Sequence, residues 1–375
     1  MRSHAGLRRR LGDLELSPEV RPMGLPLVPE EVCEHSDIRL SEFRKDILQT
    51  ELYSKSSPND FKVVSAPYYS VNAFCVPLDW DTQPIVFVNY GIPDFALKAY
   101  QVLLLSIPTQ LWGNVAPVMG IDGWEIVASH RWKKQMANIC VAYANHRTLV
   151  NAPYENEGKR LNFEFTVESG LSNIFSGSGL IGASGNTDIS RAVLLYPAQE
   201  RLMGSLITCM EVFIVAHELG HLALNHEILQ SAAASQTLRL EKEADEYALE
   251  LSLQICQVKG ISPSILIASV VSFFKLMIFL EECHFARISG VPDRNTPQAI
   301  SKLSALRERV GSLEKLGEAN VSSLTEILCN SIPRSNFSDT IFDIIARFYK
   351  LDPVIRPEMT RAEVDATINE VLNNK

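Results

Sequence analysis

The N-terminal half of the chain alternates short apolar runs with polar breaks. The runs "FKVVS" (61–65) and "PIVFVNYG" (84–91) are rich in β-branched and aromatic residues, with proline and aspartate between them, which predicts strands. The next apolar segment, "IPDFALKAYQVLLLSI" (92–107), has an aspartate near its start and ends before a proline, as expected of a helix. Further on, the alternation in "RLNFEFTVESG" (160–170) predicts another strand, and a long loop rich in glycine and serine covers 169–190.

From Pro197 onward the pattern is almost entirely helical. It breaks where glycine, proline or small polar residues gather, at 260–263, 289–297 and 330–338. The most apolar window, 264–280, contains Lys275 and falls short of the roughly 20 residues that a bilayer requires, so we interpret it as a buried helix. The whole pattern predicts an α+β fold, mostly α, with a small N-terminal sheet packed on a helical core.

Three regions differ in composition. Residues 1–40 are rich in proline, arginine and glutamate without periodicity, which predicts a poorly ordered arm. Residues 41–310 hold the strand and helix patterns and are expected to form one domain. The amphipathic segments in 311–375 predict a C-terminal helical extension that closes the fold.

Composition and charge narrow the function classes. The 375 residues are 46% hydrophobic, enough for a substantial core, and the net charge of −9 argues against a nucleic-acid partner, which would favour a basic face. The seven cysteines are widely spaced without a C-x-x-C pair, which suggests reduced thiols. The first thirty residues lack the apolar stretch of a secretory signal. We therefore expect a cytoplasmic protein with no integral membrane span.

The strongest chemical signal lies inside an apolar helix, in "MEVFIVAHELGHLALNHEI" (210–228). His217 and His221 are four residues apart and share one helix face, where both rings can reach one ion. Imidazole nitrogen is a preferred ligand of zinc, and a catalytic zinc site needs only three protein ligands because water takes the fourth position. Glu218 lies beside the pair, where it can take a proton from that water as the general base of an H-E-x-x-H motif. Gly220 allows another backbone to approach.

A second cluster, "LEKEADEYALEL" (240–251), offers the third ligand. Glu241 and Asp245 are also four residues apart on one helix face. We assign zinc binding to Glu241, whereas Asp245 would accept the ring N–H of a liganding histidine and fix its tautomer. Glu243 is the competing third ligand, although it falls off that face. The stretch between the two clusters is long enough for two antiparallel helices to meet at the ion.

"HELGH" followed by "EKEAD" resembles the gluzincin metallopeptidases, whose signature is H-E-x-x-H with a downstream E-x-x-A-D. The resemblance implies a zincin-like helical core, Zn²⁺ as cofactor, His217, His221 and Glu241 as ligands, Glu218 as base and Asp245 behind a ligand. Among soluble relatives the chain is most similar, over about residues 60–310, to the Lit peptidases of phage exclusion. The ImmA/IrrE regulators, with a similar "HELGHL", are the nearest rival.

The chain departs from these families at one place. They often carry His-Pro and then Arg-Ile after the glutamate helix, where this chain has Thr296-Pro297 and then Lys302-Leu303. His284, in "EECHFARI", is a possible substitute as a transition-state stabiliser, although a structural histidine is the alternative interpretation. His226 points off the ligand face, and we expect it at the surface or behind a ligand.

These observations predict a zinc metalloendopeptidase of the gluzincin type. Its partner would be a protein or peptide substrate lying extended along an edge strand, with "RLNFEFTV" (160–167) or "RAVLLYP" (191–197) as candidates. The resemblance implies a specific intracellular protein as substrate, in phage defence or stress response. The alternative is a catalytically inactive zinc-binding regulatory or partner-recognition protein. Glu218 favours the enzyme, because a purely structural zinc site needs no base.

Overall fold

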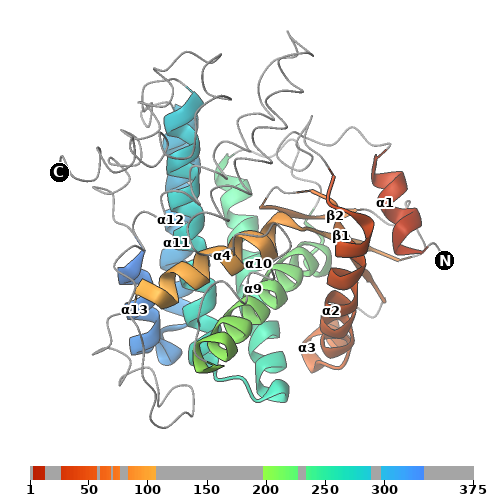
Figure 1. Cartoon of the computed structure of the whole chain (residues 1–375), viewed down its shortest axis with the longest axis horizontal. Helices are drawn as coiled ribbons and strands as arrows, with labels where there is room; N and C mark the ends of the chain where they lie inside the picture. The colour runs from red at the N-terminus through yellow and green to blue at the C-terminus, as the bar shows by residue number, and fades with distance from the viewer. Residues whose placement is uncertain are drawn as a thin grey trace, which may run out of the picture.

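The computed structural model shows a mostly helical molecule with one small sheet (Figure 1). The structure describes residues 3–12, 27–56, 60–68, 71–76, 83–106, 197–226, 234–288 and 297–332. The helices are α1 (His4–Gly12), α2 (Glu30–Leu48), α3 (Glu51–Ser56), α4 (Gly91–Ser106), α9 (Pro197–Ala223), α10 (Ala234–Lys259), α11 (Pro263–Ile288), α12 (Pro297–Leu316), the 3-10 helix η4 (Glu318–Asn320) and α13 (Ser323–Ser331). The strands are β1 (Lys62–Ala66), β2 (Ala73–Val76) and β3 (Ile85–Asn89). The expected α+β fold, mostly α with a small N-terminal sheet on helices, is confirmed.

The sheet has the strand order β1-β3-β2, with β1 parallel and β2 antiparallel to β3. Val63 and Val86 belong to the main core, whereas Val64 and Phe87 pack with the N-terminal helix on the other face. Because both faces are covered, β1 and β3 are buried at every position. The short edge strand β2 was not among the runs that we singled out.

The helix α1 covers one face of the sheet, within the segment expected to be a poorly ordered arm. Leu7 and Leu11, one helical turn apart, are fully buried there. Arg8 donates to Asp37 of α2 over 2.5 Å, and Asp37 accepts the backbone N–H of Ser65 in β1 over 2.7 Å. Within the described residues 3–12, the structure thus differs from the expectation, because a leucine pair and one arginine attach this helix to the sheet. Residues 13–26 of the expected arm lie outside the described residues.

The long helices α9 and α10 form the centre of the molecule (Figure 1). They run antiparallel, since His217 contacts Asp245 while Cys209, earlier in α9, contacts Cys256, later in α10. Gly220 allows the close approach that we expected, because a Cβ there would lie 3.2 Å from the backbone of Ala244. The stretch Arg201–Ala223 is long and apolar enough to cross a bilayer, but 72% of its apolar window is buried inside the protein.

The remaining helices pack around this pair. On the side away from the sheet lie α11, α12 and α13 (Figure 1). The helix α4 packs on α9, and its Tyr100 donates a hydrogen bond of 2.8 Å to the carbonyl of Ser269 in α11. The boundary expected at 310/311 falls within α12, so the predicted extension begins inside a helix that contacts α10 and α11. The predicted strand 160–170 and loop 169–190 lie outside the described residues.

Candidate metal centre

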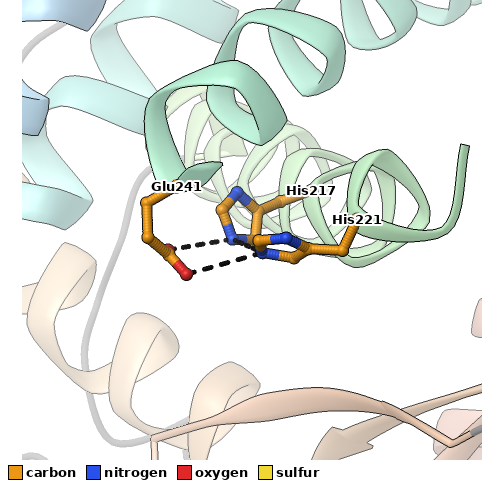
Figure 2. Close-up of side chains that lie close together, drawn as sticks. All are labelled: His217, His221 and Glu241. Carbon is orange, nitrogen blue, oxygen red and sulfur yellow. Dashed lines mark hydrogen bonds and ion pairs between the residues drawn. The ribbon is translucent and has the colours of Figure 1, made fainter. Parts of the chain in front are cut away.

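The apolar helix α9 brings two histidines to the start of α10. His217 and His221 lie one turn apart, and their Nε2 atoms are 3.2 Å from each other. Glu241, the eighth residue of α10, reaches both rings: its Oε2 lies 3.3 Å from Nε2 of His217 and its Oε1 lies 3.5 Å from Nε2 of His221. Figure 2 shows the three side chains pointing toward one another from the two helices. The structure therefore brings together the three ligands expected from the sequence.

The spacing of these donors fits a tetrahedral ion. Zinc binds imidazole nitrogen and carboxylate oxygen at about 2.0–2.2 Å, so two donors of one tetrahedron lie about 3.3–3.6 Å apart. The two imidazole nitrogens, 3.2 Å apart, agree with that edge length, and one oxygen of Glu241 approaches each ring, at 3.3 and 3.5 Å. With one donor atom taken from each residue, all three lie within 4.8 Å of one another, close enough for one ion. The donor set also fits chemically, because two imidazoles and one carboxylate leave a fourth position to water.

Asp245 lies directly behind His217. Its Oδ1 is 2.9 Å from Nδ1 of the ring, so Nε2 is the nitrogen that faces the cluster. Burial alone would lower the pKa of His217, but the contacts with Asp245 and Glu241 outweigh it and raise the pKa to about 10. The two carboxylates therefore favour a positive charge at this point, which is the charge that a divalent ion would bring.

His221 is held by a different chain of groups. Its Nδ1 lies 2.9 Å from Nδ1 of His226, and Nε2 of His226 lies 3.2 Å from Oε2 of Glu243. Burial, together with the positive charge near His217, lowers the pKa of His221 to about 4, which keeps its ring neutral at pH 7. A neutral ring that presents Nε2 to the ion carries its proton on Nδ1, so we assign His226 Nδ1 as the acceptor.

The competing ligand Glu243 thus lies outside the cluster. Its carboxylate contacts His226 and Arg239, and it is not among the three grouped donors. His226 lies behind a histidine of the cluster, one of the two positions that we considered for it.

Glu218 lies on the side of α9 that faces the sheet, where its carboxylate meets the edge strand β2. The thiol of Cys75 donates to the carbonyl oxygen of Glu218 over 3.0 Å, and its sulfur lies 3.5 Å from Oε2 of the same residue. Burial, with the negative charge of Glu241, raises the pKa of Glu218 against the lowering effect of His217. A carboxylate with a raised pKa is a stronger base, which suits the role expected for Glu218.

Comparison with known families agrees with this geometry. Residues 189–314 match the family model described as Peptidase U49, which is the Lit peptidase family. This segment is a Peptidase U49 domain. The resemblance to the Lit peptidases is therefore confirmed over this segment, and the match to this family implies metallopeptidase activity. The matched residues span α9, α10 and α11 and end within α12. No curated protein and no solved structure matches the chain.

The U49 domain contains one residue near the cluster that the sequence did not indicate. Arg309, on α12, lies with Nε 2.8 Å from Oδ2 of Asp245, Nη2 2.7 Å from Oδ1 of Asp245 and Nη1 2.7 Å from Oε2 of Glu241. Its guanidinium carbon is 4.9 Å from the ring centre of Phe274 on α11. A single arginine 64 residues from Asp245 forms no motif with it, so only the fold reveals the contact.

Cys75 was also missed, because it is 143 residues from Glu218 and lies on a strand of four residues. The possible transition-state stabiliser His284 belongs to the U49 domain as well. Its backbone is part of α11, but its side chain is outside the described residues, so its role stays a prediction.

Proposed function

We propose that this chain is a zinc-dependent endopeptidase in which Glu218 is the general base. The observation that carries the proposal is the grouping of His217, His221 and Glu241, whose donor atoms lie within 4.8 Å of one another, close enough to bind one ion. Zinc would polarise the scissile carbonyl and lower the pKa of a bound water toward 7.

The protein groups divide the remaining work. His217 and His221 would hold the ion through Nε2, and Asp245 keeps the His217 ring in the orientation and tautomer that this requires. Glu218 would accept a proton from the attacking water at its carboxylate and return it to the leaving nitrogen. Its raised pKa supports the first of these steps, because a stronger base accepts the proton more readily.

The strand β2 is our candidate for the substrate-binding edge. It is an edge strand of the three-stranded sheet, and its Cys75 lies against Glu218. An extended peptide that paired with β2 would pass beside the base, with backbone hydrogen bonds supplying affinity. The two segments that we considered from the sequence, 160–167 and 191–197, lie outside the described residues apart from Pro197 at the start of α9.

We further propose that the substrate is a specific protein inside the cell and that cleavage serves phage defence or a stress response in the cytoplasm. The support is the Lit family match together with the resemblance on "HELGH" and "EKEAD". A catalytically inactive zinc protein is the alternative that the experiment must exclude.

The test compares the full-length wild type with Glu218→Gln, in metal content and in cleavage of host proteins. We expect one zinc per chain in both, by elemental analysis, because Glu218 is not a ligand. New protein N-termini should appear in a cytosolic extract only with the wild type, before or after phage challenge. Equal patterns from the two proteins would indicate that the zinc has a structural or regulatory role, and a wild type without zinc would remove the proposal.

A further inference from the structure

Arg309 connects the two carboxylates of α10 that matter most to the cluster. Three of its nitrogens contact Glu241 and Asp245, all at 2.7–2.8 Å. Glu241 and Asp245 are four residues apart on the same helix face, so one planar guanidinium can reach both. The ring of Phe274 lies against the guanidinium and limits its movement.

The two carboxylate oxygens of Glu241 have different contacts. Oε2 is the oxygen that Arg309 holds, at 2.7 Å, and it also lies near His217. Oε1 faces His221 at 3.5 Å. An arginine that fixes one carboxylate oxygen sets the rotation of the whole group, and thereby the direction in which the other oxygen points.

Arg309 also compensates negative charge at the cluster. Glu218, Glu241 and Asp245 are three acidic groups in a small buried region, and one divalent ion would leave a single negative charge over. Asp245 is completely buried, where an uncompensated carboxylate is costly. Two nitrogens of Arg309 contact the two oxygens of Asp245 at 2.8 and 2.7 Å and supply the compensating positive charge.

We propose that Arg309 is a positioning residue of the metal centre: its fork holds Asp245 against His217 and turns Glu241 so that Oε1 is presented to the ion. The inference rests on the proposed function. It goes beyond an ordinary ion pair between helices, because α10 and α12 already have one in Lys242 and Glu308, which lie 2.7 Å apart in an exposed position.

That neighbouring pair supplies a matched control. We would measure zinc affinity by competition with a chromophoric chelator in the wild type, Arg309→Met, Arg309→Lys and Glu308→Gln, with thermal unfolding of each. We expect Arg309→Met to bind one zinc about 10–100-fold more weakly, the usual effect of losing a group behind a ligand. Arg309→Lys should remain at least several-fold weaker, because lysine keeps the charge but has no fork. Glu308→Gln should bind zinc as the wild type does.

The sign of the change separates positioning from simple charge balance. If Arg309 only compensated charge, its loss would leave a more negative site, and Arg309→Met would bind zinc more tightly while Arg309→Lys matched the wild type. Either result, or unchanged affinity in both variants, overturns the proposal. Should Arg309→Met fail to fold, Arg309→Lys alone decides. The visible spectrum of the cobalt-substituted protein adds a second readout: it should change in Arg309→Lys and not in Glu308→Gln.

The zinc measurement separates a failure of the proposed function from a failure of the role proposed for Arg309. A wild type that binds no zinc overturns the proposed function and this inference with it. A wild type that binds one zinc with an affinity independent of Arg309 overturns the inference alone.

Discussion

The two histidines of the metal cluster are supported from behind in different ways. His217 rests on Asp245, which is fully buried and held by two nitrogens of Arg309. His221 rests on His226, whose other ring nitrogen contacts Glu243, a side chain that is 38% exposed. One support is a buried carboxylate fixed by a neighbouring helix, and the other is a chain of groups that ends at the solvent.

The difference follows from position along the helices. His217 is more than a full turn inside α9, and Asp245 of α10, held by Arg309 of α12, lies behind it. His221 lies in the last turn, next to the end of α9. A buried ion pair is strongly coupled to its surroundings, while an exposed carboxylate interacts through water and is worth little. The two histidines should therefore respond unequally to the loss of the groups that support them.

The largest effect should come from breaking the buried support with Asp245→Asn. The change leaves Arg309 without its bidentate partner and removes the carboxylate charge that lies 2.9 Å from Nδ1 of His217. Removing one partner of a buried ion pair costs about 3–5 kcal/mol, so we expect the free energy of unfolding to fall by about 3 kcal/mol. Zinc affinity should fall about 10–100-fold as well. Chemical denaturation and chelator competition measure the two quantities, and a variant that keeps both would contradict this view of His217.

The close approach of α9 to α10 at Gly220 can be tested with Gly220→Ala, which should have the next largest effect on the free energy of unfolding. The new methyl group would lie 3.2 Å from the backbone of Ala244 and 3.3 Å from the ring of Tyr247. Overpacking of this kind costs about 1–3 kcal/mol, and backbone atoms cannot move aside as a flexible side chain can. Gly204→Ala is the matched control on the same helix, because nothing lies within 4 Å of its Cβ. Equal unfolding temperatures in the two variants would argue against close packing of α9 on α10 at Gly220.

The sequence predicted much of this site because its information is local. His217, His221, Glu241 and Asp245 each lie four residues from a partner, and a helix converts that spacing into a shared face. It missed Arg309 and Cys75 because they reach the site from distant elements with no spacing signal. The sequence also did not indicate the helix at residues 4–12, because basic residues dominate the composition there. Leu7 and Leu11, which lie one turn apart among them, are nevertheless buried.

Glu211, a buried acid on α9, contrasts with Asp245 on α10. Burial raises the pKa of Glu211 to about 7 against the opposing effect of Arg39, which offers one contact of 2.7 Å where Arg309 offers a fork. Between pH 4.5 and 7 the folded protein then holds more protons at Glu211 than the unfolded chain does, so its contribution to the free energy of unfolding falls as pH rises. For Asp245, whose pKa is lowered, stability is instead lost as pH falls.

We therefore expect Glu211→Gln to weaken the pH dependence of stability between pH 4.5 and 7, by an amount on the order of 1–3 kcal/mol across the window. Denaturation curves of the variant and the wild type at several pH values measure this difference. A variant whose stability follows the wild type in parallel over that range would show that Glu211 is charged throughout.

The smallest effect should come from breaking the exposed support of His221. Glu243→Gln keeps a hydrogen-bond acceptor for Nε2 of His226 and removes only a charge that is also shared with Arg239. Because such a charge is screened by water, we expect less than about 1 kcal/mol in stability and less than a tenfold change in zinc affinity. Glu241→Gln, two residues earlier, is the matched comparison and should lose the metal. If Glu243→Gln instead loses zinc and Glu241→Gln retains it, the third ligand is Glu243, and the carboxylate that closes the site comes from the solvent-facing side of α10.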